Sequence, residues 1–520
     1  MRKLLTTLSF VILFIVIKAQ TKVFKEVSNE ISSQFNAIIQ DNNLVGYLAF
    51  TKLEKSNKDS FNYRITIMDE NLNDIGTVNF KDQTLLLQSI AFEEDILCVT
   101  YIKSSYFSNV VSNKELKEIK KKENGTVVLQ FIDLKGKIVK TNNYNITLDL
   151  GLNYANGTFN KVTIEQGNTK YPVQIYNVPQ KGFACFFGDD NNKNVFLFDR
   201  VGKEIWKNTI SEKGSSYKLH AGKNGVYLLY SRLNNQGREV QCYSLQNGST
   251  INKVKLKDDN DNELQVTGLD NDPVSGDVYI NGVIIDKDKT AYTSLRTKDV
   301  FHAPYLGYFT INIVGQQNNV TKNYSYLLDG NHENFITKSG KLIEAKVWPL
   351  IDGSFKDYAG NTYFVGSGLT KKPIWGIIVP SVILSPLVIP SAYLLGVFGT
   401  TKSRFEKGLI IKQSSNGIIS LDNQLELNTS KYTARRVDAR LFYNREYHLV
   451  SNSEKRINYL IADDYKNIII YNIQEKKIVR KIPHKEGSNF IKIYPAKEGS
   501  IMVSEYNKKE KTTKLSIETL

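Results

Sequence analysis

The chain repeats a short strand–turn–strand phrase, and this repetition limits the folds that are open to it. Each copy is an apolar run rich in β-branched and aromatic residues, a polar turn that usually carries Asp or Gly, and a second extended run. Copies lie at 63–80, 127–140 and 194–206, with a looser one at 467–480. This pattern predicts a β-hairpin. A hairpin cannot bury its own apolar face, so recurring hairpins are expected to stack into a repeat architecture.

Alternation of apolar and polar residues divides the chain beyond residue 40 into units of three or four short strands. A second phrase, Asp272–Gly282, returns as Asp357–Gly366; its glycines lie 84 positions apart, which we interpret as two spacings of 42. Repeats of about 40–50 residues are typical of four-stranded propeller blades. We therefore predict an all-β protein, a β-propeller of seven or eight blades, with two β-sandwich domains as the alternative. The candidate units are centred near residues 60, 115, 190, 235, 295, 395, 470 and 505.

The last unit contains only two strand patterns, at 500–506 and 513–517. Closure of a propeller often uses a strand from the other terminus, and Thr21 to Phe35 is the candidate. In the alternative interpretation, Val27 to Ile39 forms a short helix.

The first residues have the pattern of a secretory signal. Arg2 and Lys3 precede an apolar stretch from Leu4 to Ile17, and Ala19 is the small residue before the expected cut. The apolar core is shorter than the roughly 20 residues that span a bilayer, which disfavours an uncleaved anchor. We expect a signal peptide at 1–19 and one propeller-like domain at 20–520, with an apolar insert at 373–401. The expected location is the periplasm, the outer-membrane surface or the extracellular space.

A strongly basic region follows residue 430. The formal net charge is +15 for the whole chain. A basic surface suits binding to an acidic glycan or an anionic lipid. Nucleic acid is a less suitable partner because the protein is expected to be exported. The alternative is a solvated face with no partner. The candidate basic patch consists of Arg435, Arg436, Arg440 and Arg445.

The segment from Pro373 to Thr401 has no charged residue. Its length and polarity match a transmembrane helix, but Pro380, Pro386 and Pro390 would each interrupt one. Three interpretations stay open: an apolar loop packed against the scaffold or a partner, an element that dips into a membrane, and a membrane span. The candidate contact residues are Trp375, Ile378, Val382, Leu387, Tyr393 and Leu395.

Three units have a long connection just before the hairpin phrase, at Lys103 to Asn124, Asp286 to Pro304 and Lys371 to Phe405. Equivalent connections of a propeller emerge on one face, and long loops on a rigid scaffold often form binding surfaces. The alternative is that these loops are tolerated insertions.

No linear motif assigns a catalytic residue. The five histidines are widely separated, and the sequence contains no nucleophile elbow, phosphate-binding loop or dinucleotide fingerprint. Cys98, Cys185 and Cys242 each lie inside an apolar run, which predicts thiols in strand cores. A Cys98–Cys185 bridge between neighbouring repeats is the alternative.

No cofactor is predicted. The acidic loop Asp258–Glu263 resembles a calcium loop, but it lacks the glycine and the final glutamate of an EF-hand. A second polar turn lies at 189–192, and hydrated turns are the interpretation for both. Calcium at these turns is the alternative to hydrated turns.

Three blocks, Leu44–Glu54, Met68–Phe80 and Glu94–Lys103, resemble a family of exported Bacteroidetes proteins that carry a domain of unknown function across nearly the whole mature chain. The bias toward Asn, Lys, Ile and Tyr and the Ala19–Gln20 cut are similar to that family. The resemblance implies export and a repeat-rich β fold, and it supplies no catalytic residues.

The leading hypothesis is an exported, non-catalytic binding protein whose long loops on one face contact a protein or glycan partner. One alternative is a hydrolase or lyase that acts on an extracellular polymer. Another is a membrane-associated scaffold held by residues 373–401. The sequence leaves the ligand, the blade number and the oligomeric state open.

Overall fold

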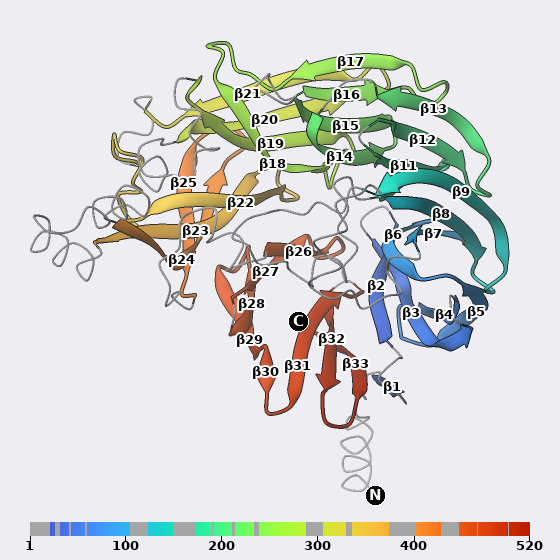
Figure 1. The fold of residues 1–520 in the computed structure, drawn as a ribbon. Coiled ribbons are helices and arrows are strands. Elements are labelled where there is room, and N and C mark those ends of the chain that lie inside the picture. The colour runs from blue at the N-terminus through green and yellow to red at the C-terminus, as the bar shows by residue number, and fades with distance from the viewer. Residues whose placement is uncertain are drawn as a thin grey trace, which may run out of the picture.

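The computed structural model describes residues 21–25, 32–40, 43–57, 60–104, 123–148, 173–189, 191–210, 214–232, 239–287, 305–328, 335–373, 401–427, 447–464, 466–497 and 499–520. Its 33 regular elements in these ranges are all β-strands (Figure 1). They form eight antiparallel sheets arranged as a ring in chain order. The protein is an eight-bladed β-propeller. The predicted fold class is confirmed, and the sandwich alternative is wrong.

The first three blades are β2 (Ser32–Gln40), β3 (Asn43–Asn57), β4 (Ser60–Asp69) and β5 (Asp74–Asp82); β6 (Leu85–Glu93), β7 (Ile96–Lys103), β8 (Glu123–Asp133) and β9 (Ile138–Leu148); and β10 (Gln174–Val178), β11 (Gly182–Gly188), β12 (Lys193–Asp199) and β13 (Glu204–Ile210). The next three are β14 (Gly214–Gly222), β15 (Gly225–Arg232), β16 (Glu239–Tyr243) and β17 (Thr250–Lys255); β18 (Glu263–Asn271), β19 (Val278–Ile285), β20 (Tyr305–Val314) and β21 (Asn319–Tyr326); and β22 (Trp348–Lys356), β23 (Thr362–Pro373), β24 (Thr401–Gln413) and β25 (Ile419–Leu425). The last two are β26 (Tyr447–Asn452), β27 (Ile457–Asp463), β28 (Asn467–Asn472) and β29 (Lys477–Pro483); and β30 (Lys485–Glu486), β31 (Asn489–Pro495), β32 (Ser500–Asn507) and β33 (Thr512–Thr519) with β1 (Thr21–Lys25).

The hydrophobic core lies between blades. The buried apolar side chains form eight clusters, and each cluster joins one pair of neighbouring blades around the ring. Middle strands such as β7 and β11 are buried almost throughout, because a blade covers each of their faces. The repeat architecture follows from this sharing of apolar faces.

The recurring hairpin phrase forms the third and fourth strands of a blade. Its aspartate closes the turn between them. The carboxylates of Asp69, Asp133 and Asp199 accept the backbone N–H four residues later at 2.7–2.8 Å. This is the local side-chain bond that favours Asp at the start of a tight turn.

The second phrase lies in the turns between first and second strands, β18–β19 and β22–β23. These turns belong to neighbouring blades. The interpretation of the glycine separation as two repeats is therefore wrong. One repeat covers the whole distance, because two long connections, 286–304 and 327–347, lengthen blade 5 and its link to blade 6.

The N-terminal strand closes the ring. β1 pairs antiparallel with β33, from Thr21 opposite Ser516 to Lys25 opposite Thr512. It thereby supplies the outermost strand of blade 8, as the sequence predicts. The helical alternative for 27–39 is wrong, because Ser32–Gln40 is β2, the first strand of blade 1.

The three cysteines are buried free thiols, as predicted for strand cores. Cys98 in β7 and Cys185 in β11 lie in the same cluster between blades 2 and 3, but no disulfide joins them. Burial raises the pKa of all three thiols.

Candidate functional site

The two ends of the propeller differ in their connections. Because the strands of a blade are antiparallel, the turns from strand one to two and from three to four lie at one end. Each of these turns spans six residues or fewer, and we call this end the short-turn face. The connections from strand two to three and from blade to blade lie at the other end, the long-connection face.

All connections of 19 residues or more join strand ends at the long-connection face. Three of them follow the second strand of a blade, as predicted from the sequence. The other three link successive blades, and the sequence analysis missed them, although the spacing between strand patterns could have indicated them. The six connections are 104–122, 286–304, 374–400, 149–173, 327–347 and 426–446.

Both segments that the sequence analysis singled out begin and end at this face. The apolar insert connects β23 to β24, and the basic segment connects β25 of blade 6 to β26 of blade 7. Among the described residues, no helix has the length and apolar character that crossing a membrane requires. The predicted contact residues Trp375, Ile378, Val382, Leu387, Tyr393, Leu395, Arg435, Arg436, Arg440 and Arg445 lie outside the described residues.

One part of a long connection, residues 335–347, is described and lies against the scaffold. Ile336 and Leu342 form an isolated β-bridge and belong to the apolar cluster between blades 5 and 6. The indole N–H of Trp348 donates to the carbonyl of Ser339 at 3.1 Å, and Lys341 lies over the Trp348 ring. This connection is anchored by the same apolar packing that joins the blades.

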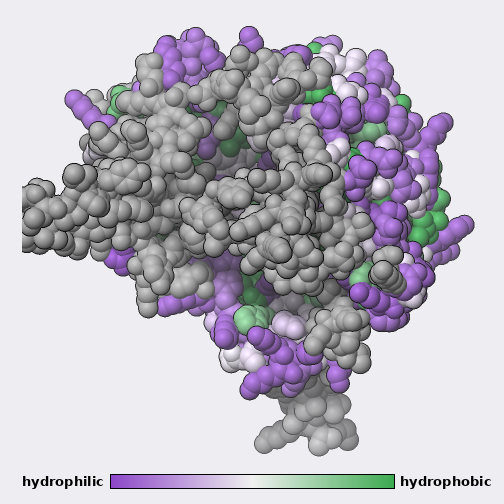
Figure 2. All heavy atoms as spheres, in the orientation of Figure 1, coloured by the Kyte–Doolittle hydropathy of each residue, from purple (hydrophilic) through white to green (hydrophobic). Residues whose placement is uncertain are grey.

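Basic residues gather on the outermost strands of the blades. The sequence analysis did not predict this concentration of charge. These strands carry eleven lysines and arginines against four acidic residues. The outer edge of the blades is mainly hydrophilic where it is visible (Figure 2). Lysines on an exposed strand edge discourage pairing with strands of other molecules. The basic residues are Lys22, Lys25, Lys81, Lys140, Lys207, Lys253, Lys255, Lys322, Lys477, Arg480 and Lys481.

The acidic turn at 258–263 is organised by Asp258. Its carboxylate accepts the backbone N–H groups of Asn260 and Asn262, the Asn262 amide and the Tyr326 hydroxyl, at 2.8–2.9 Å. Burial opposes ionisation of Asp258, but these bonds outweigh it and lower its pKa. Among the described residues, no three His, Cys, Asp or Glu side chains gather as they would to hold a metal ion.

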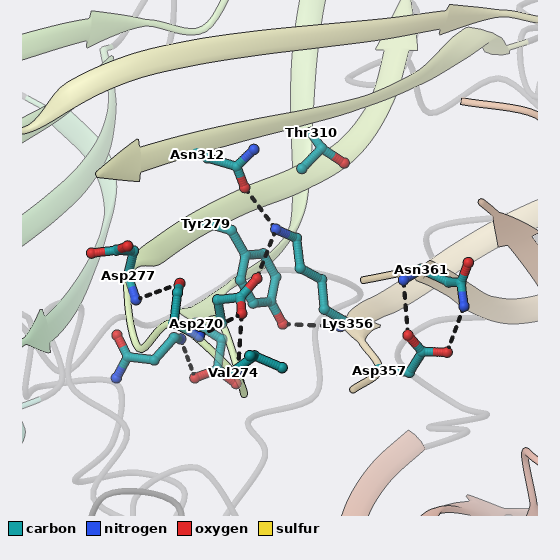
Figure 3. A network of polar contacts seen from close by, with 12 residues as sticks. Asp270, Val274, Asp277, Tyr279, Thr310, Asn312, Lys356, Asp357 and Asn361 are labelled. Atoms are coloured by element: carbon teal, nitrogen blue, oxygen red, sulfur yellow. Dashed lines mark hydrogen bonds and ion pairs between the residues drawn. The ribbon is translucent and has the colours of Figure 1, made fainter. Parts of the chain in front are cut away.

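A buried ionic network joins blades 5 and 6 at the short-turn face (Figure 3). The Lys356 ammonium lies 3.2 Å from the Asp272 carboxylate and donates to Asn312 Oδ1 at 2.6 Å. The ammonium also lies 4.8 Å from the centre of the Tyr279 ring. The Tyr279 hydroxyl accepts a hydrogen bond from the backbone N–H of Lys356. Lys356 is 9% exposed. The network neutralises a buried cation and fixes the contact between two blades.

A second polar group lies on the first strands of blades 3, 4 and 5, which surround the axis of the ring. His220 of β14 is 5% exposed, and its Nε2 lies 3.1 Å from Asn271 Oδ1 of β18. The Tyr176 ring of β10 meets the His220 ring edge-on at 5.6 Å. Lys218 and Asp270 are exposed, whereas their neighbours Leu219 and Leu269 are buried.

These side chains influence one another electrostatically. Burial lowers the pKa of His220, and the nearby Asp270 charge and the Asn271 bond oppose this effect. Desolvation also lowers the pKa of Lys218, and the Asp270 charge opposes this effect. Burial and the Asp270 charge raise the pKa of Tyr176. These contacts join the first strands of three blades, and no sequence motif pointed to them.

No protein-family model matches the chain, and no curated protein matches it. Among solved structures, the chain is similar to the Dos1 propeller, with 8% identity, coverage of 95% of this chain and 93% of that chain, and a TM-score of 0.42. It is also similar to the WD40 domain of SCAP from fission yeast, with 8% identity, coverage of 96% and 98%, and a TM-score of 0.38. A protein of unknown function from Bacteroides caccae matches with 11% identity, coverage of 74% and 94%, and a TM-score of 0.27. These values carry no information about activity or partner.

Proposed function

We propose that this protein is an exported, non-catalytic binding protein whose partner contacts lie on the long-connection face. The observation that supports the proposal is the one-sided distribution of connections. All six long connections begin and end at one face, and no turn on the opposite face exceeds six residues. Insertions without a role would have no reason to avoid the short-turn face.

The scaffold suits this role because its blades support one another. Eight apolar clusters and the Lys356 network hold the strands that carry the connections. Loop sequences on such a scaffold can vary without loss of the fold, which is how rigid β scaffolds usually present binding surfaces. The proposed partner is a protein or a glycan in the periplasm, at the outer-membrane surface or outside the cell.

The experiment shortens connections 374–400 and 426–446 separately to short Gly-Ser linkers. Binding is measured on a glycan array and by cross-linking to biotinylated cell-envelope proteins, together with the thermal midpoint of unfolding. We expect both shortened variants to keep a midpoint close to that of the wild type and to lose the binding signal. Unchanged binding by both variants would contradict the proposal.

Matched controls come from the short-turn face. Val201 and Val274 are 48% and 70% exposed there, so Val201→Asp and Val274→Asp should fold normally. Binding should survive in both. If these variants lose binding and the shortened variants keep it, the binding site lies on the short-turn face instead. Fractionation of the producing cells and sequencing of the mature N-terminus test export, and a start at Gln20 is expected.

The apolar insert favours a second candidate function, contact with a membrane. Its 29 uncharged positions run from Pro373 to Thr401, and its flanking strands end at the long-connection face. A membrane-associated scaffold would present this face to the lipid. Sedimentation with liposomes separates the two functions, because only membrane contact predicts binding to lipid that is lost on shortening 374–400.

A further inference from the structure

The outer hairpins of blades 2, 3 and 4 share an exposed aliphatic side chain at the same structural position. In each hairpin the outermost strand contains a one-residue β-bulge close to its start. The bulged residue is Val139, Ile205 or Ile251, and these side chains are 41%, 43% and 39% exposed. A bulge of this kind bends the strand and redirects a side chain. At the other ends of β9 and β13, in contrast, Leu148 and Ile210 are buried.

These three hairpins lie side by side at the short-turn face. The side-chain amide of Asn142 in blade 2 donates to the Gly202 carbonyl of blade 3 at 2.8 Å, and that of Asn208 in blade 3 donates to the Gly248 carbonyl of blade 4. Val201, beside Gly202, is a fourth exposed aliphatic residue. The four aliphatic residues therefore belong to one continuous surface. We call it the hairpin strip, and it consists of residues 134–141, 200–207 and 244–253.

The hairpin strip is strongly basic. It contains seven lysines and arginines, all exposed, against one acidic residue, Glu204. One of the seven, Arg200, forms an ion pair with Glu94. The equivalent hairpins of blades 1 and 6, residues 70–77 and 414–421, have no basic residue. The basic residues of the strip are Lys135, Lys137, Lys140, Arg200, Lys203, Lys207 and Lys253.

Separate aliphatic side chains among basic ones limit the partner that this strip fits. A protein interface buries a contiguous and closely packed apolar core, whereas these aliphatic residues stand one or two to a hairpin. A soluble polyanion would neutralise the charges but would leave the aliphatic side chains in water. An anionic bilayer uses both features. Its fluid interface accepts separate apolar side chains, and its negative surface attracts lysine and arginine.

We propose that the hairpin strip docks on an anionic lipid surface. Val139, Val201, Ile205 and Ile251 enter the boundary between headgroups and acyl chains, and the basic residues meet the headgroup phosphates. Docking in this way turns the long-connection face away from the membrane. The inference does not depend on the partner proposed for that face. It also differs from membrane contact through the apolar insert, because the insert begins and ends at the opposite face.

The first experiment measures sedimentation of the mature wild-type protein with vesicles. Vesicles of phosphatidylcholine mixed with phosphatidylglycerol are compared with vesicles of phosphatidylcholine alone. We expect binding to the anionic vesicles to be about tenfold tighter or more. It should weaken when the salt concentration rises from about 0.1 M to about 1 M, because salt screens the attraction. No binding to anionic vesicles, or equal binding to both kinds, would overturn the proposal.

Two triple variants locate the contact. One carries Val139→Ser, Ile205→Ser and Ile251→Ser, and the other carries Lys137→Gln, Lys140→Gln and Lys203→Gln. All six side chains are exposed, so both variants should keep the wild-type thermal midpoint. Each should bind anionic vesicles about tenfold more weakly or worse. Wild-type affinity in either variant would overturn the proposal.

Matched variants make the same changes outside the strip. Val314→Ser, Leu328→Ser and Ile418→Ser replace aliphatic residues that are 42%, 59% and 52% exposed. Lys492→Gln, Lys508→Gln and Lys514→Gln remove three exposed charges from blade 8. Both matched variants should bind vesicles as the wild type does. An equal loss in the matched charge variant would mean that only net charge matters, and the proposal would be wrong.

Three further outcomes would assign the strip or the membrane contact differently. Vesicle binding that is lost on shortening 374–400 and kept in both strip variants would place the membrane contact on the opposite face. Binding to heparin, an acidic polysaccharide, without binding to vesicles would make the strip a glycan site. A dimer in analytical ultracentrifugation that the aliphatic strip variant abolishes would make it an interface between copies of this chain. Each of these results contradicts the proposal.

Discussion

The side-chain amide of Asn142 in blade 2 donates to the carbonyl oxygen of Gly202 in blade 3, at 2.8 Å. Gly202 lies in the turn between β12 and β13 and has a φ of 84°. The arrangement recurs around the ring, and the acceptor always has a positive φ. An outer-strand side chain of one blade thus binds the turn of the next. The further pairs are Asn208 with Gly248, Asn252 with Asn318, Ser325 with Gly417 and Asn423 with Lys476.

Replacement of Asn142 tests the strength of this contact. Asn142→Ala leaves the partly buried Gly202 carbonyl without its donor, and we expect a loss of about 1 kcal/mol in the free energy of unfolding. Urea denaturation followed by fluorescence measures it. Asn143→Ala is the matched control, because Asn143 is the exposed neighbour on the same strand. Equal effects of the two substitutions would show that the bond contributes nothing.

Position 202 also requires glycine because the structure leaves no room there for a side chain. A Cβ at this position would overlap the ring of Phe131 in blade 2, and its φ disfavours other residues. Gly202→Ala should lower the free energy of unfolding by about 2–4 kcal/mol, from overpacking plus backbone strain.

Gly360 is the control for this substitution, because it has a φ of 80° but a Cβ added there would meet no atom within 4 Å. Gly360→Ala should therefore cost only the backbone strain, about 1 kcal/mol. Denaturation curves of the two variants separate the two contributions. If Gly360→Ala costs as much as Gly202→Ala, the contact with Phe131 is unimportant.

The Asp272–Lys356 pair should make stability depend on pH. Burial opposes ionisation of Asp272, but the N–H groups of Ser275 and Val274 and the Lys356 charge lower its pKa below the ordinary value. A carboxyl whose pKa is lower in the folded state contributes stability above its unfolded pKa and loses it as the pH falls through the folded value. The free-energy difference between wild type and Asp272→Asn should therefore be largest near pH 7 and shrink below about pH 4.

Removal of the cation provides the complementary measurement. Lys356→Met leaves the Asp272 carboxylate half-buried beside an apolar group, and we expect it to cost about 1–3 kcal/mol at pH 7. In the double variant with Asp272→Asn the cost of Lys356→Met should be smaller, because no charge is left unpaired. Additive effects in this cycle would mean that the two residues do not interact.

Loss of the N-terminal strand should open the ring. Phe24 meets the Phe35 ring of blade 1 at 5.0 Å and belongs to the cluster between blades 8 and 1. Deletion of residues 20–25 exposes β33 and this cluster, so the thermal midpoint should fall by several degrees or more. Phe24→Ala should reproduce part of the loss, whereas Val23→Thr, at a position that is 62% exposed, should not. Calorimetry measures all three, and an unchanged midpoint after deletion would show that β1 does not close the ring.

Most of the fold could be predicted from the sequence because the strands and turns depend on interactions between residues close together in the chain. Alternating side chains mark the strands, and aspartates such as Asp133 close turns with backbone N–H groups only four residues away. The eight candidate units correspond to the eight sheets, although the sequence prediction was of seven or eight blades. The terminal strand was predictable as well, because the last unit lacks one.

The site could not be predicted, because its contacts join different blades. Tyr176, His220 and Asn271 are ordinary strand residues in the sequence, each one blade apart, and only the packing of neighbouring blades brings them into contact. The same holds for Asn142 and Gly202. The spacing of two glycines gave a wrong repeat length for a related reason, since it cannot distinguish one long repeat from two short ones.

The sequence by itself thus determined the strands, the turns and the repeat architecture, since these depend on interactions within a few residues. The tertiary structure alone decided that eight blades close the ring, which side chains meet across blades and that the three long links between blades open on the same face as the three predicted connections, because those relations depend on the geometry of the closed ring.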